Sequence, residues 1–79
     1  MGVMQEIYDE FNIGKGSIYV SGAVAIIDSV KRILIMSEDI ITVEVGKGRI
    51  SVNGRDLWVE YLSGERMCIK GQFYSVEFL

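Results

Sequence analysis

Short runs of alternating hydrophobic and polar residues fill most of this chain and recur around glycine turns. Residues 18–22, 50–54 and 67–71 are such runs, and they end at Gly22, Gly54 and Gly71. Together with the polar break at residues 37–39, they divide the chain into four units of roughly sixteen residues. Strands and turns therefore account for nearly every residue, which leaves little sequence for a catalytic site.

The alternation predicts eight short β-strands separated by tight turns. Asn53-Gly54 is the strongest hairpin signal, because a type I′ turn requires positive φ at both central residues. Ser21-Gly22 and Lys70-Gly71 are weaker versions of the same signal, and further turns are expected at 46–48, 63–65 and, less obviously, 28–32. The predicted strands are 17–20, 24–28, 32–36, 40–45, 49–52, 57–62, 66–69 and 73–78.

We expect an all-β fold, a small antiparallel β-sandwich or meander, because a single open sheet would leave too many apolar faces in water. A short β-solenoid with one rung per unit is the alternative, but turns of the X-Gly type favour hairpins. Residues 33–36 are apolar on both sides. This pattern suits a central strand covered on both faces, or a strand with one face covered by another subunit.

The first residues follow a different period. Met4, Ile7, Tyr8 and Phe11 fall at helical spacing with polar residues between them, which predicts a short amphipathic helix over residues 3–11. A helix this short needs a surface to lie on, either its own sheet or a neighbouring copy. Residues 12–17 supply Asn and glycines that would end it. The expected division is a helix and linker over 1–16 and a β domain over 17–79.

Length and charge narrow the class of protein. A chain of 79 residues is one domain with a marginal core, which self-association would supplement. The net charge is −3 and the basic residues are scattered, so we expect no nucleic-acid partner. No segment is apolar enough to span a bilayer, and residues 1–6 lack a signal-peptide pattern. We expect a cytoplasmic protein whose lone Cys68 is a packing thiol.

The sequence contains few sets of residues that could form a catalytic or metal-binding site. There is no histidine and one cysteine, so histidine-dependent triads and His/Cys zinc sites cannot be built. The acidic sets at 6–10 and 38–39 lack a calcium-loop pattern, and the Gly-Lys-Gly stretches lack the spacing of a phosphate loop. We expect no enzyme, no metal and no cofactor; an enzyme would need a site made of Tyr, Lys, Asp and Glu alone.

Some aromatic residues are candidates for contacts with other protein chains. Trp58 is predicted to lie opposite an inward set of Leu57, Val59 and Tyr61, on the face shared with Leu62. Packing inside a sandwich is favoured over an exposed contact patch, because a small domain needs every large side chain for core area. The candidate interface residues are Ile7, Tyr8, Phe11, Trp58, Leu62 and Phe73.

Several motifs occur in a particular order: Ile-x-Val-x-Gly at 18–22, Ser-Glu-Asp-Ile at 37–40, Gly-x-Ile-x-Val-x-Gly-x-x-Leu-x-Val at 48–59, and Ile-x-Gly-x-Phe-x-Ser-Val-x-Phe at 69–78. This succession resembles the YabP/YqfC family of small sporulation proteins. The resemblance implies a β-sandwich related to the immunoglobulin-like class and a role in spore formation in the mother cell. It implies no catalytic residues. The chain departs from the family at residues 14–16, where a proline-containing lead-in is common, and at Trp58 and Tyr74, which replace smaller aliphatics.

The sequence suggests two candidate functions from different classes. The first is a structural or adaptor module that self-associates or docks on a protein partner through strand edges and the N-terminal helix. The second is a small β domain that binds an apolar ligand between its sheets. The first is favoured because the chain is rich in apolar residues and has no reactive constellation.

Overall fold

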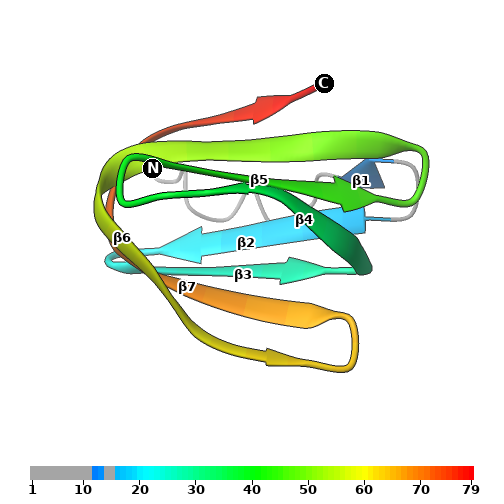
Figure 1. The fold of residues 1–79 in the computed structure, drawn as a ribbon, viewed down its shortest axis with the longest axis horizontal. Coiled ribbons are helices and arrows are strands. Elements are labelled where there is room, and N and C mark those ends of the chain that lie inside the picture. The colour runs from blue at the N-terminus through cyan, green and yellow to red at the C-terminus, as the bar shows by residue number, and fades with distance from the viewer. Residues whose placement is uncertain (1–11, 14–15) are drawn as a thin grey trace.

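Antiparallel pairing builds the whole described part of the chain, residues 12–13 and 16–79 of a computed structural model. Seven strands form one sheet in the order β1-β2-β3-β7-β6-β5-β4 (Figure 1). Their bounds are β1 (Asn12–Ile13), β2 (Gly16–Ser21), β3 (Val24–Asp28), β4 (Val30–Met36), β5 (Ile40–Val45), β6 (Gly48–Ser63) and β7 (Arg66–Phe78). The all-β prediction is confirmed, and the antiparallel pairs rule out the solenoid.

The strand count differs from the prediction because two predicted hairpins are absent. Predicted strands 49–52 and 57–62 are one strand, β6, and predicted strands 66–69 and 73–78 are one strand, β7. The chain does reverse at Gly22, Gly46 and Gly64, which all have positive φ, and between β3 and β4 at Ser29 (φ 65°). A further two-residue strand, β1, lies within the stretch predicted as a turn. The predicted helix over 3–11 lies outside the described residues.

Asn53-Gly54 marks a bend of β6 in place of a reversal. A Cβ at Gly54 would collide with the carbonyl oxygen of Gln72 on β7, and Leu57 Cδ2 would lie 2.9 Å away. Opposite, a Cβ at Gly71 (φ +141°) would lie 2.8 Å from the carbonyl oxygen of Asp56. Glycine is therefore needed at both positions so that two backbones can approach closely where the strands bend.

The bend folds the sheet over on itself. Residues 48–53 of β6 pair with β5 and with residues 75–78 of β7, whereas residues 58–63 pair with the start of β7, which pairs in turn with β3. Figure 1 shows β6 and β7 turning together at one end of the molecule. The sheet is continuous, so the described residues do not form the two separate sheets of the predicted sandwich.

The hydrophobic core lies between the two halves of this folded sheet. One half supplies Ile18, Ala25, Ile27, Met67 and Ile69, and the other supplies Ile41, Val43, Val45, Ile50 and Val52. Leu57 fills the bend between them. Folding over thus buries apolar side chains of β2, β3, β5, β6 and β7 without a second sheet, which satisfies the physical requirement that motivated the sandwich prediction, whereas β4 contributes only Val30 to the buried core.

Candidate protein-interaction surface

The last strand of the sheet, β4, is an edge strand. It pairs with β5 on one side, and no described strand pairs with its other side. Leu34, Ile35 and Met36 are 41%, 48% and 55% exposed, so the apolar run at 33–36 is only partly covered. The prediction of a central strand covered on both faces was wrong. Cover from another subunit stays a prediction.

β4 follows β3 in sequence but does not pair with it, because β3 pairs with β7. β4 therefore lies at the far end of the sheet, next to β5. The pairing with β5 shifts register between Val30 and Arg32 and again between Ile33 and Ile35. Such shifts are common in edge strands, where they limit uncontrolled pairing with other chains. We call residues 31–36 the β4 edge.

A second unpaired stretch lies in β6. Residues 58–63 pair with β7 only, and we call them the β6 edge. Trp58, Tyr61 and Leu62 are 54%, 43% and 48% exposed. Six of the nine exposed large hydrophobic side chains of the described residues thus belong to these two edges, which marks them as the candidate contact surface. Residues 73–78 of β7 and residues 18–21 of β2 also pair on one side only, and each stretch carries one of those nine side chains, Tyr74 and Tyr19.

Backbone hydrogen bonds hold the β4 edge near the β6 edge at both ends. The Val30 N–H donates to the carbonyl of Glu65 (2.8 Å), and the Leu57 N–H donates to the carbonyl of Glu38 (2.9 Å). The Gly54 N–H donates to the carbonyl of Asp39 (2.9 Å). These bonds attach the turn after β4 to the bend of β6 and fix where the exposed apolar side chains lie.

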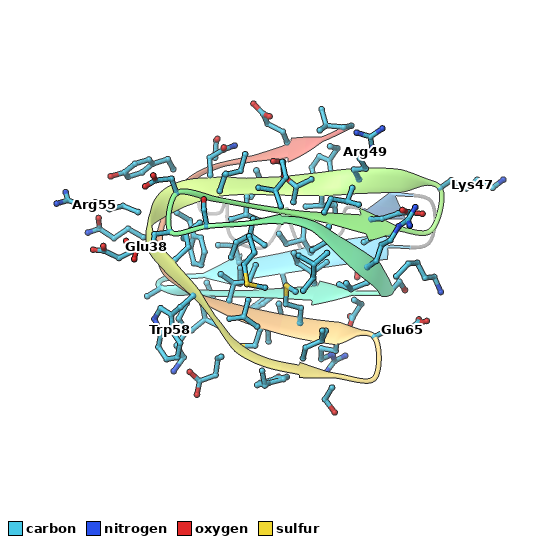
Figure 2. All side chains as sticks on the ribbon, in the orientation of Figure 1. Glu38, Lys47, Arg49, Arg55, Trp58 and Glu65 are labelled. Carbon is cyan, nitrogen blue, oxygen red and sulfur yellow. The ribbon has the colours of Figure 1, made fainter. Side chains whose placement is uncertain are left out.

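The side chain of Ser37 stabilises the turn at residues 37–39. Its Oγ accepts hydrogen bonds from the N–H groups of Asp39 (3.2 Å) and Ile40 (3.1 Å). With the backbones of Glu38 and Asp39 committed to the bend, both acidic side chains lie at the exposed surface. Figure 2 shows Glu38 with Arg55 and Trp58 at the bend, and Lys47, Arg49 and Glu65 at the opposite end of the molecule.

The start of β4 is basic. Lys31 Nζ lies 2.9 Å from Glu65 Oε2, and Arg32 Nε lies 2.7 Å from Glu44 Oε1 on β5. The Arg32 side chain is 71% exposed, so this ion pair adds little to stability. Nearby, Arg66 Nε donates to Asp28 Oδ1 (2.6 Å), and this hydrogen bond raises the pKa of Arg66. One end of the β4 edge is therefore cationic and the turn that follows it is anionic.

The predicted interface residues fall into three groups. Trp58 and Leu62 are about half exposed, so Trp58 does not pack inside the domain as favoured from the sequence. Phe73 is partly buried and packs against the core. The remaining three, Ile7, Tyr8 and Phe11, lie outside the described residues.

A register shift between Val59 and Tyr61 changes the predicted faces of β6. Leu62 lies opposite Met67, a core residue, whereas Tyr61 lies opposite Cys68 on the other face. Tyr61 therefore does not belong to the inward set. Cys68 is 4% exposed, in accordance with a packing thiol. Leu34, Ile35 and Met36 were not among the candidate interface residues, although the apolar run at 33–36 had suggested cover by another subunit as one of two alternatives.

Potential metal ligands and surface hollows were the other candidate features of the described residues. They contain no group of three or more His, Cys, Asp or Glu side chains arranged to hold a metal ion. Two open hollows lie on the surface, one lined by Glu44, Lys47 and Arg49 among others and one beside Gly71 and Tyr74. Both hollows are shallow and open to solvent, and the exposed strand edges remain the most distinctive surface of the described residues.

Comparison with known proteins gives one match. The model of the YabP family matches residues 15–79, which confirms the resemblance inferred from the motifs. No curated protein and no solved structure matches significantly. Membership in this family indicates a small protein related to sporulation. Among the residues that the structure describes, no helix has the length and apolar character needed to cross a membrane.

Proposed function

The chain belongs to the YabP family, and we propose that it acts in sporulation as a structural or adaptor protein, through contacts with other protein chains. We propose further that it has no enzymatic activity and works in the mother cell. The absence of histidine from the sequence and the burial of Cys68 support the first of these statements, since they remove the commonest general base and one common nucleophile.

The observation that carries the proposal is the concentration of exposed apolar side chains on two unpaired strand edges. Unpaired strands offer backbone N–H and C=O groups to another chain, and exposed apolar side chains beside them add contact area. Ile35 on β4 and Trp58 on β6 are each about half exposed on strands of this kind. Together these features fit recognition by strand addition.

Binding of an apolar ligand between the halves of the sheet has less support. The side chains between the halves, among them Ile27, Val43, Ile50 and Ile69, are fully buried and packed in a single cluster. A ligand there would have to displace packed side chains, at a cost comparable to overpacking a core. Native mass spectrometry of freshly purified protein tests this alternative, which requires a bound apolar mass.

A complementation experiment tests the proposed function. In a sporulating host that lacks its copy of the gene, we expect the wild-type chain to restore heat-resistant spores and a localised fluorescent fusion. Trp58→Glu and Ile35→Glu should restore neither, because each places a charge in the contact surface. Tyr74→Glu is the matched control, since Tyr74 is 67% exposed and belongs to β7, outside the residues of both edges.

Two results would contradict the proposal. One is full sporulation with either edge variant, and the other is unchanged sporulation after deletion of the gene. Circular dichroism of the purified variants separates loss of contact from loss of folding, because all three substitutions lie at exposed positions.

A further inference from the structure

Four strands of one half of the sheet lie side by side: β2, β3, the start of β7 and the end of β6. Their inward side chains, such as Ile18, Ile27 and Met67, belong to the core cluster. Successive side chains of a strand point to opposite faces, so the residues between these point away from the core. We call the outward side of these four strands the outer face.

One apolar row crosses the middle of the outer face. Its members, in order across the four strands, are Tyr19, Ile26, Cys68 and Tyr61. The two tyrosines at its ends are each 43% exposed, and Cys68 is buried without belonging to the core cluster. The row is therefore an apolar strip on the surface with an aromatic side chain at each end, as is typical of protein contact surfaces.

A charged row borders the apolar strip on one side. It contains Asp28 on β3 and Arg66 on β7, and Arg66 Nε donates to Asp28 Oδ1 at 2.6 Å. The two side chains are 41% and 58% exposed. A carboxylate accepts several hydrogen bonds and a guanidinium group donates several, so this ion pair can bind further charged groups without breaking.

The row on the other side of the apolar strip runs from a small to a large side chain. Ser21 lies opposite Val24, and Trp58 lies opposite Lys70, so Ser21 and Trp58 occupy the two ends. Trp58 is 54% exposed. Lys70 Nζ lies 3.9 Å from Glu60 Oε1, and these long side chains keep their charged groups in water at the margin of the outer face.

We propose that the outer face binds the outer face of a second copy of this chain, about a twofold axis that runs along the strand direction between β3 and β7. This inference rests on the proposed function, because it names the partner of Trp58 and Tyr61, which belong to the β6 edge. Sheets that pack face to face keep their strand directions within about 30° of each other, and this axis satisfies that condition.

The outer face is complementary to itself under this axis. The axis exchanges β2 with β6 and β3 with β7, so each row faces the same row of the second copy. Tyr19 then faces Tyr61 of the second copy, and the two aromatic rings can pack together. The large side chain of Trp58 faces the small Ser21. Each contact occurs twice.

The charges favour this axis over the other twofold arrangement of two sheet faces. Along the strand direction, Asp28 of each copy faces Arg66 of the other, so two ion pairs join into one closed network. An axis across the strands would instead set Arg66 over Lys70 of the second copy, and like charges would meet twice. The face spans four strands, about 14 Å at the usual spacing, so the contact lies below about 1,200 Å². We expect a dimer that dissociates on dilution.

Sedimentation velocity across a dilution series tests the dimer. The wild-type chain should dimerise reversibly. Tyr61→Glu should raise the dissociation constant by about tenfold or more, because it buries a charge in the apolar strip at two equivalent contacts. Tyr74→Glu is the matched control, since Tyr74 is 67% exposed on β7 outside the outer face, and it should leave the constant within about twofold of the wild-type value. Circular dichroism verifies that both variants fold.

An exchange of charges tests the axis without breaking the ion pair inside one copy. Asp28→Arg combined with Arg66→Asp reverses every charge of the network, so this double variant should dimerise with itself within about threefold of the wild-type constant. It should bind the wild-type chain about tenfold or more weakly, because position 28 of one chain then carries the same charge as position 66 of the other. Fluorescence energy transfer between donor-labelled and acceptor-labelled chains measures both constants.

The failures of the two proposals can be distinguished. A wild-type chain that stays monomeric at every concentration overturns the dimer, and the proposed function stands if Ile35→Glu, outside the outer face, still abolishes sporulation. If Tyr61→Glu also abolishes sporulation in that case, the outer face binds a different protein. A dimer that Tyr61→Glu and Tyr74→Glu weaken equally lies on another surface. Mixed dimers as stable as the wild-type dimer, or a folded double variant that does not dimerise with itself, overturn the axis.

Discussion

Two glycines at the bend decide whether the sheet can fold over. Gly54 and Gly71 lie where β6 and β7 approach most closely, and each position leaves no space for a side chain. Gly22 is a glycine for a different reason: its φ is +59°, and nothing lies within 4 Å of where a Cβ would be. The sequence shows three similar X-Gly pairs, but steric exclusion acts at two of them and backbone conformation alone at the third.

This difference predicts unequal losses of stability. Gly54→Ala should lower the free energy of unfolding by about 3 kcal/mol or more, because a backbone must move to admit the methyl group. Gly22→Ala should lower it by only about 1 kcal/mol, the cost of a left-handed conformation for alanine. Urea unfolding followed by circular dichroism measures both. Equal losses would show that the close approach at Gly54 does not constrain the fold.

At the level of strands, most positions could be predicted from the sequence, but the connections at the bend could not. Alternation predicted strand residues within all six of the longer strands, because side-chain period depends only on local sequence, but it divided β6 and β7 into two strands each. The hairpin at Asn53-Gly54 was wrong because a small residue suits both a reversal and a close approach of backbones. What decides between them is Gly71 and Gln72 on β7, which local sequence does not reveal.

The candidate surface was predictable to a similar degree. Trp58 and Leu62 were candidate interface residues, although packing inside a sandwich was favoured for Trp58, and both are about half exposed. For residues 33–36 the sequence left two alternatives open, a central strand or a strand covered by another subunit, because their exposure depends on the order of strands. β3 pairs with β7, more than forty residues later in the chain, and this long-range pairing leaves β4 at the end of the sheet.

The helix predicted over residues 3–11 would be one further element beside the strands. We expect Ile7→Ser combined with Phe11→Ser to weaken association more than folding, because the core of the described residues comes from β2 to β7 and a helix of nine residues adds little to it. Thermal unfolding and light scattering on the same samples check this. Unfolding of the domain by the double substitution would contradict the expectation.

At the level of the whole molecule, the topology sets how fast the chain can fold. Val24 pairs with Lys70 and Ala25 with Ile69, so the central pairing of the sheet closes long loops. We expect refolding on the scale of about milliseconds to seconds, as for other β proteins with non-local contacts. Stopped-flow fluorescence of Trp58, the one tryptophan in the chain, measures this rate. Refolding within microseconds would mean that local contacts dominate.

The uninterrupted course of β6 and β7 through the bend has a consequence for the evolution of this domain. Each of these strands belongs to both halves of the sheet. A cut at the bend would sever two strands at once and expose the shared core, so neither half could be transferred to another protein as an independently folding module. Gene fusion or duplication would therefore have to carry both halves of the sheet together.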